Sequence, residues 1–137
     1  MKQCYLSFTT LFLLFPIIIF IYNSKKTGFE ITLALMLLTN IIFSFLFWLH
    51  PIQNSLFHVY DGVLAKISYI AFPIYILFIK HIEYWLKLLF LMIFLSSSMM
   101  FYYSNDHSKK SWCSKEHLLC HSLFHFLISV GSAIAFL

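Results

Sequence analysis

The sequence predicts an all-α protein, a polytopic transmembrane helical bundle of about five spans, and two observations lead to this prediction. Of the 137 residues, 61% are hydrophobic and only 10% are charged, with a mean hydropathy of +0.87. A water-soluble chain of this length needs more polar surface than these residues supply. The apolar residues are also gathered into runs of about 20, the length that crosses a hydrocarbon core of roughly 30 Å as a helix. We therefore expect an integral, multi-pass membrane protein.

The apolar runs fill the chain and predict a single transmembrane helical domain over residues 1–137. The five predicted spans cover about residues 5–22, 31–49, 57–79, 84–103 and 117–137. The first is expected to be a retained span and not a signal peptide, because its apolar run is long and no small-x-small cleavage site follows it.

Short polar segments separate these spans. The turn NSKKTG follows the first, and Pro51 ends the second because proline disfavours helix for the residue before it. The tight connection KHIE follows the third span, and the hydrophilic segment SNDHSKKSWCSKE is expected to form a loop before the fifth. Tryptophans near the span ends, Trp48, Trp85 and Trp112, are typical of an aromatic belt at the membrane interface.

Charge and cysteine usage exclude other classes of protein. The formal net charge is +4, and all nine basic residues are lysines lying mostly between or at the ends of the apolar runs. No basic stripe with interleaved aromatic residues lies outside the spans, so nucleic acid is not an expected partner. The cysteines Cys4, Cys113 and Cys120 match no zinc or redox spacing.

Three histidines give the clearest indication of chemistry. His117, His121 and His125 are four residues apart, so a helix places them on one stripe of the last span. Ionisable residues within a membrane are costly and indicate a functional site by default. We predict a metal or proton site at His121 and His125, whereas His117, near the span end, is expected to be an interfacial anchor.

A second set of polar residues lies around the connection between the second and third spans. Ser44 lies in the second span and His50 at its end, while His58 and Asp61 begin the third span three residues apart on one helix face. Asp61 has an alternative partner in Lys66, which is otherwise expected to be a snorkelling anchor.

Together these residue types fit a zinc site. Neutral imidazoles are good Zn²⁺ ligands, and a catalytic site keeps three protein ligands with one position open for water. His121 and His125 would supply two ligands, and either His50 or His58 the third. Asp61 would orient a histidine or act as general base, and Ser44 would stabilise an oxyanion.

Two motifs resemble a known family. HSLFHFLISVG resembles the last-helix signature of the CREST superfamily of membrane hydrolases, which includes alkaline ceramidases and adiponectin-receptor-like proteins, and HVYDGVLAKIS looks like its Asp-containing helix. The resemblance covers about residues 44–68 and 121–131. It implies a reduced form of a fold with about seven spans, and a zinc-dependent hydrolase that cleaves an amide or ester bond of a membrane lipid.

The third zinc ligand stays open between two histidines. In the CREST pattern a Ser lies four residues before this His. Leu46 holds that place relative to His50, and Asn54 relative to His58. The alternative from another class is a non-enzymatic multi-pass membrane protein with a structural metal or a proton relay, and a third reading is an assembly factor whose polar residues only join helices.

Overall fold

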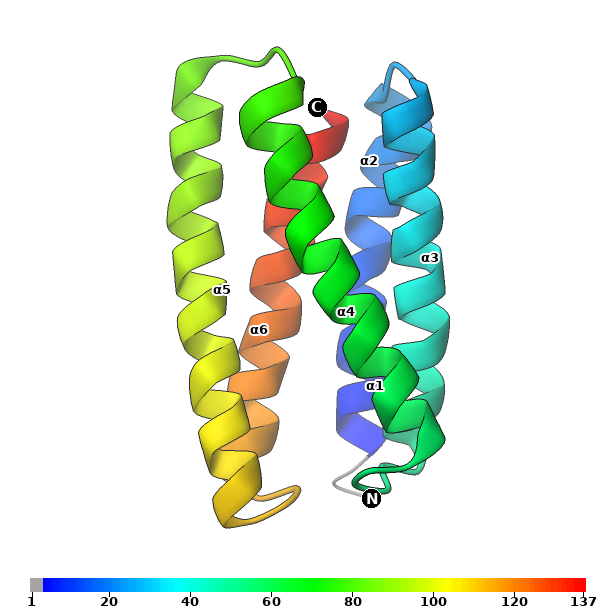
Figure 1. Ribbon diagram of the computed structural model, residues 1–137, viewed down its shortest axis with the longest axis vertical. Coiled ribbons are helices and arrows are strands. Elements are labelled where there is room, and N and C mark those ends of the chain that lie inside the picture. The colour runs from blue at the N-terminus through cyan, green and yellow to red at the C-terminus, as the bar shows by residue number, and fades with distance from the viewer. Residues whose placement is uncertain (1–3) are drawn as a thin grey trace.

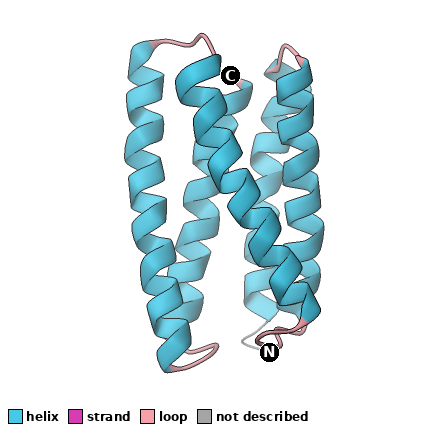
Figure 2. Ribbon diagram, viewed as in Figure 1, coloured by secondary structure: helices cyan, strands magenta, loops and turns pink. Residues whose placement is uncertain are grey.

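The computed structural model describes residues 4–137 as a bundle of long helices running alternately up and down (Figure 1). No strand occurs among these residues, and the connections are short and lie at the two ends of the bundle (Figure 2). Five stretches are long and apolar enough to cross a membrane: Leu6–Asn23, Gly28–Leu49, Leu56–Ile79, Tyr84–Lys110 and Lys115–Phe136. The all-α fold class is confirmed, and residues 4–137 contain five helices that are long and apolar enough to cross a membrane.

Proline shapes the first span. It consists of α1 (Cys4–Thr10), the 3₁₀ turn η1 (Leu11–Leu13) and α2 (Leu14–Asn23). Pro16 has no N–H, so it cannot bond the carbonyl of Phe12 as a residue four positions later normally does. The hydroxyl of Ser129, from the last span, donates to this carbonyl instead. The break in the first span thus becomes a point of attachment between the two ends of the chain.

The remaining spans begin at side-chain caps. They are α3 (Gly28–Leu49), α4 (Leu56–Ile74) continued by the π-helical turn η2 (Tyr75–Ile79), α5 (Tyr84–Lys110), and α6 (Lys115–Ala133) continued by the 3₁₀ turn η3 (Ile134–Phe136). The hydroxyls of Thr27, Ser55 and Ser114 each accept the backbone N–H three residues later, which satisfies a donor that the first turn of a helix leaves free.

The fourth helix is longer than the sequence predicts. The expected loop after residue 103 is helical as far as Lys110, and the connection to α6 spans only residues 111–114. The polar composition was a misleading signal, because a helix can leave the apolar layer and continue as a solvated helix. An Asp106–Lys110 ion pair of 3.0 Å supports this last part of α5, and three basic residues in its final turn interact favourably with the helix dipole.

The helices differ in how closely they pack. α5 and α6 lie side by side along their length, while α4 crosses the bundle diagonally, close to α3 at the end where the N-terminus lies (Figure 1). A Cβ added at Gly131 of α6 would lie 3.2 Å from the Ile93 side chain of α5, so glycine permits this close approach. α6 is the most buried span, and α4 and α5 are the least buried.

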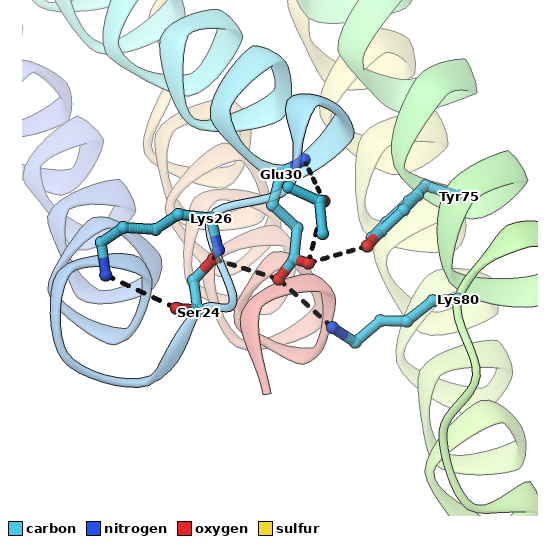
Figure 3. A network of polar contacts seen from close by, with 6 residues as sticks. Ser24, Lys26, Glu30, Tyr75 and Lys80 are labelled. Carbon is cyan, nitrogen blue, oxygen red and sulfur yellow. Dashed lines mark hydrogen bonds and ion pairs between the residues drawn. The ribbon is translucent and has the colours of Figure 1, made fainter.

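A buried ion pair joins the beginning of α3 to the end of η2, at the end of the bundle where the C-terminus lies (Figure 3). The carboxylate of Glu30, only 1% exposed, accepts hydrogen bonds from Lys80 at 3.3 Å, Tyr75 at 2.9 Å, Ser24 at 3.1 Å and Thr27 at 3.2 Å. The π-helical turn brings Tyr75 and Lys80 to this carboxylate, and the Lys80 N–H closes the turn on the Tyr75 carbonyl at 2.7 Å. Each of these two buried charges therefore has the other as its partner.

Removing one charge of this pair should destabilise the fold. Glu30→Gln leaves the Lys80 ammonium buried without a counter-ion, and we expect the free energy of unfolding in detergent to fall by about 3 kcal/mol. Glu30→Gln combined with Lys80→Met removes both charges and should recover most of this loss. Asp106→Asn, which breaks the exposed pair, serves as the control and should cost less than about 1 kcal/mol. An equal effect of Glu30→Gln and Asp106→Asn would contradict the structural role of the pair.

Candidate intramembrane site

A cavity of ≈ 410 Å³ lies between α3, α4, α5 and α6. Its volume is within the range of about 300–1,000 Å³ typical of small-molecule sites, and most of its lining is apolar. The ionisable and candidate catalytic side chains that line it are Ser44, His58, Asp61, Lys66, His117, His121 and His125. Every site residue predicted from the sequence lines this one cavity except His50, which is exposed at the C-terminal cap of α3.

The two predicted catalytic residues are neighbours. Asp61 on α4 lies close enough to Ser44 on α3 for their side chains to interact. Farther along the same two helices, the amide of Asn40 donates a hydrogen bond to the hydroxyl of Ser68. α3 and α4 are therefore joined by two polar contacts in a row, and the first of them borders the cavity.

His58 and His117 are held by the same local motif. A residue with positive φ, Asn54 or Cys113, precedes the capping serine of α4 or α6, and the histidine follows that serine by three residues. The backbone N–H of the histidine donates to the serine hydroxyl. The backbone N–H of the positive-φ residue donates to Nδ1 of the histidine ring, at 2.9 Å for His58 and 3.1 Å for His117. The motif fixes both rings at helix N-termini on the same end of the bundle.

This motif decides which ring nitrogen carries the proton. A neutral imidazole has one N–H, so a ring whose Nδ1 accepts a hydrogen bond carries its hydrogen on Nε2. His58 and His117 are therefore Nε2–H donors toward their surroundings. His117 is 3% exposed and lines the cavity, so its ring faces the interior of the bundle.

His125 has the opposite arrangement. The Thr9 hydroxyl donates to the Leu6 carbonyl at 2.9 Å, so the contact of 2.8 Å between Thr9 and His125 has the His125 Nδ1–H as donor. The Nε2 lone pair of His125 is thus available for a proton or a metal. The neighbouring His121 contacts the Ser104 hydroxyl through Nδ1 at 3.0 Å, and its ring centroid is 4.6 Å from that of His125.

Two of the predicted ligands fit a zinc ion. His121 and His125 are adjacent, and His125 offers a free lone pair, so these two suit the role of ligands. His58 presents an N–H at its free nitrogen, and His50 is outside the cavity. Within residues 4–137, no three His, Cys, Asp or Glu side chains are grouped closely enough to hold a metal ion. Two ligands of the expected set are therefore assembled, and zinc binding stays a prediction.

Trp48 is part of the site, although the sequence suggested an interfacial anchor. Its side chain is 2% exposed and lines the cavity, and its ring centroid is 4.9 Å from that of His121. The indole N–H is buried with no hydrogen-bond partner among the described residues. Trp48 follows Ser44 by four residues, the spacing at which the CREST pattern has its histidine. This spacing from Ser44 is the feature of the sequence that could have identified Trp48 as a site residue.

Comparison of the chain with protein-family models, curated proteins and solved structures gives no match. The chemistry of the cavity is therefore inferred from its own residues. Their common property is that α3, α4 and α6, which are separate in the sequence, each contribute ionisable or hydroxyl groups to a space inside the membrane-spanning part of the bundle.

The assigned tautomers can be measured. In protein labelled with ¹⁵N at histidine, we expect the side-chain spectra at neutral pH to show His58 and His117 protonated at Nε2, and His125 protonated at Nδ1. Single His→Ala variants assign the signals. Thr9→Val removes the acceptor for His125 and should shift its tautomer toward Nε2–H while His58 and His117 keep theirs. Identical tautomers for all three histidines would contradict the hydrogen-bond assignments.

Proposed function

We propose that this protein is a membrane-embedded hydrolase that cleaves an amide or ester bond of a lipid, with zinc as the expected cofactor. One observation carries the proposal. Ser44, Asp61 and the pair His121 and His125 come from three different spans and border the same cavity. Such residues are expensive in a membrane unless they have a role. The resemblance of the His121–His125 and Asp61 segments to the CREST superfamily supports the same chemistry.

The residues suggest distinct roles. The carboxylate of Asp61 is suited to take a proton from an attacking water, because it borders the cavity and lies beside the Ser44 hydroxyl. The Ser44 hydroxyl can orient that carboxylate or donate to the oxygen of the scissile carbonyl. His125, whose Nδ1–H donates to Thr9, keeps the lone pair of Nε2 for the metal. Zinc, when held by His121 and His125, would polarise the carbonyl and lower the pKa of bound water.

A non-enzymatic function is the second candidate, and a specific observation favours it. His58 and His117 are fixed as N–H donors, and the described residues contain no group of three metal ligands. A cavity lined by the N–H donors of His58 and His117 and by the lone pair of His125 could relay protons, or hold a lipid without cleaving it. Hydrolysis of a labelled lipid by the purified protein separates this candidate from the first.

The hydrolase proposal depends on Asp61. Asp61→Asn keeps the size and much of the hydrogen bonding of the side chain but removes the base, so we expect turnover of fluorescent ceramide or phospholipid to fall by roughly 10²-fold or more. Asp106→Asn, on the exposed end of α5, is the matched control and should keep full activity. Full hydrolysis by Asp61→Asn would remove this residue from the mechanism, and no hydrolysis by the unaltered protein would favour the second candidate.

The metal ligands are tested separately, by the zinc content of the purified protein. His121→Ala and His125→Ala should each lower the bound zinc well below one ion per chain, because each removes one of few ligands. His50→Ala changes an exposed histidine outside the cavity and should leave the zinc content unchanged. Unchanged zinc in both α6 variants would rule out the assigned ligands, and a loss of zinc in His50→Ala would assign the third ligand to a rearranged α3 terminus.

A further inference from the structure

Two adjacent stripes of α4 face different neighbours. Asp61 and Ser68 belong to a stripe at positions i and i+7, and both contact α3, through Ser44 and Asn40 respectively. Gly62, Lys66 and Tyr69 form the next stripe around the helix. Tyr69 contacts α5, where its hydroxyl bonds with that of Ser98 and its ring lies 4.8 Å from that of Phe94. Lys66 and Gly62 therefore lie on the edge of α4 that is turned toward α5.

On the N-terminal side of Tyr69, α4 separates from α5. α4 runs diagonally away from α5 toward α3 as it approaches its N-terminus (Figure 1). Residues of both helices line the cavity in this region, among them Gly62 on α4 and Phe101 on α5. A Cβ added at Gly62 would meet no heavy atom within 4 Å, so there is open space on this edge of α4. Since α4 and α5 are also the least buried spans, this edge is where the cavity would open toward the bilayer.

Lys66 is an unpaired cation at this opening. It lies ten residues after Leu56, about 15 Å along the helix and so near the middle of the span. It lines the cavity, and within residues 4–137 no carboxylate lies within ion-pair distance of it, since the two ion pairs there use Lys80 and Lys110. The alternative pairing with Asp61 is thus not formed. A lysine at this depth is costly without a counter-charge.

The cavity beyond Lys66 is apolar. From Tyr69 toward the C-terminal end of α4, the walls of the cavity are formed mainly by hydrophobic side chains. They come from α3, α4, α5 and α6 and include Leu37, Phe72, Phe90, Phe94 and Ile128. A chain of methylene groups gains free energy by contact with such walls and offers no polar group that needs a partner. The cavity therefore combines one cation at its opening with an apolar interior, which is the pattern complementary to an amphiphile with an anionic group.

We propose that the opening between α4 and α5 admits a single-chain lipid with an anionic group, carboxylate or phosphate, which pairs with Lys66 while the acyl chain occupies the apolar part of the cavity. Asp61 does not oppose this anion directly, because it lies on the other stripe, beside Ser44. The inference rests on the proposed function for its biological meaning, since such a lipid would be the product or substrate of hydrolysis. Binding itself requires no hydrolysis and is tested with ligands that have neither a scissile amide nor a carboxylic ester.

Native mass spectrometry of the purified protein in a neutral detergent tests the proposal. Oleate, oleyl phosphate and oleyl alcohol share one hydrocarbon chain and differ in the charged group. We expect one bound oleate or oleyl phosphate per chain, and at least about tenfold weaker binding of oleyl alcohol, which lacks the charge that Lys66 would neutralise. Preference for one of the two anions identifies the headgroup as carboxylate or phosphate.

Variants on α4 distinguish the proposed site from a non-specific one. Lys66→Met should weaken binding of the anionic lipids about tenfold or more and leave oleyl alcohol unchanged, while Lys66→Arg should restore the anions. Gly62→Leu places an apolar side chain at the opening, where an added Cβ meets no heavy atom within 4 Å, and should weaken all three ligands. Lys109→Met, an exposed lysine of α5 outside the cavity, is the matched control and should bind as the unaltered protein does.

Two binding results would contradict the proposal. Equal binding of oleate by the unaltered protein and by Lys66→Met would leave Lys66 as a membrane anchor only, and equal binding of oleate and oleyl alcohol would remove the charge from recognition. Neither result depends on catalysis. Hydrolysis of neutral ceramide without binding of any anionic lipid would overturn this inference and keep the proposed function, whereas lipid binding without hydrolysis would do the reverse.

Discussion

Polar groups inside an apolar bilayer must find their partners within the protein, because hydrocarbon offers none. This constraint determines how the spans are joined. The carbonyl that Pro16 leaves free is bonded by Ser129, the amide of Asn40 bonds Ser68, and the Nδ1 of His125 bonds Thr9. Each of these contacts links two different spans. The polar residues of the sequence therefore act first as the contacts that set which helix faces meet.

The two ends of the bundle satisfy this constraint in different ways. At the end with the C-terminus, Glu30 and Lys80 neutralise each other, and the hydroxyl donors around Glu30 complete a closed network. At the other end, the Nδ1 atoms of His58 and His117 accept backbone N–H groups, and both residues line the cavity. The first arrangement stabilises the fold, and the second leaves groups available for a ligand.

The sparse packing of α4 against α5 follows from the residues at which α4 contacts its neighbours. α5 and α6 approach closely because Gly131 has no side chain, and α6 of this closely packed pair carries His121 and His125. α4 is held to α3 by Asp61 and Ser68 and to α5 chiefly at Tyr69, so its N-terminal half is free to diverge from α5. Any function of the cavity depends on this difference, since a uniformly close bundle would have no space for a ligand beside the histidines.

The sequence by itself determined the class of fold and much of the candidate site. Runs of about 20 apolar residues leave a membrane-spanning helix as the favourable structure, and a spacing of four places His121 and His125 on one stripe whatever the neighbours are. Rarity of polar residues within the spans singled out Ser44 and Asp61. All four line the same cavity, because the same burial cost that made them conspicuous in the sequence drives their faces inward.

Only the tertiary structure decided between residues whose sequence context was equivalent. His50 and His58 both suited a third ligand, but the end of α3 exposes the first, and a backbone N–H occupies Nδ1 of the second. Trp48 and Trp85 both lie near span ends, yet helix packing buries one beside His121 and exposes the other. Whether a polar group faces a cavity, a neighbour or lipid depends on the rotation and tilt of each helix. These are set by contacts between segments far apart in the chain, which local periodicity does not encode.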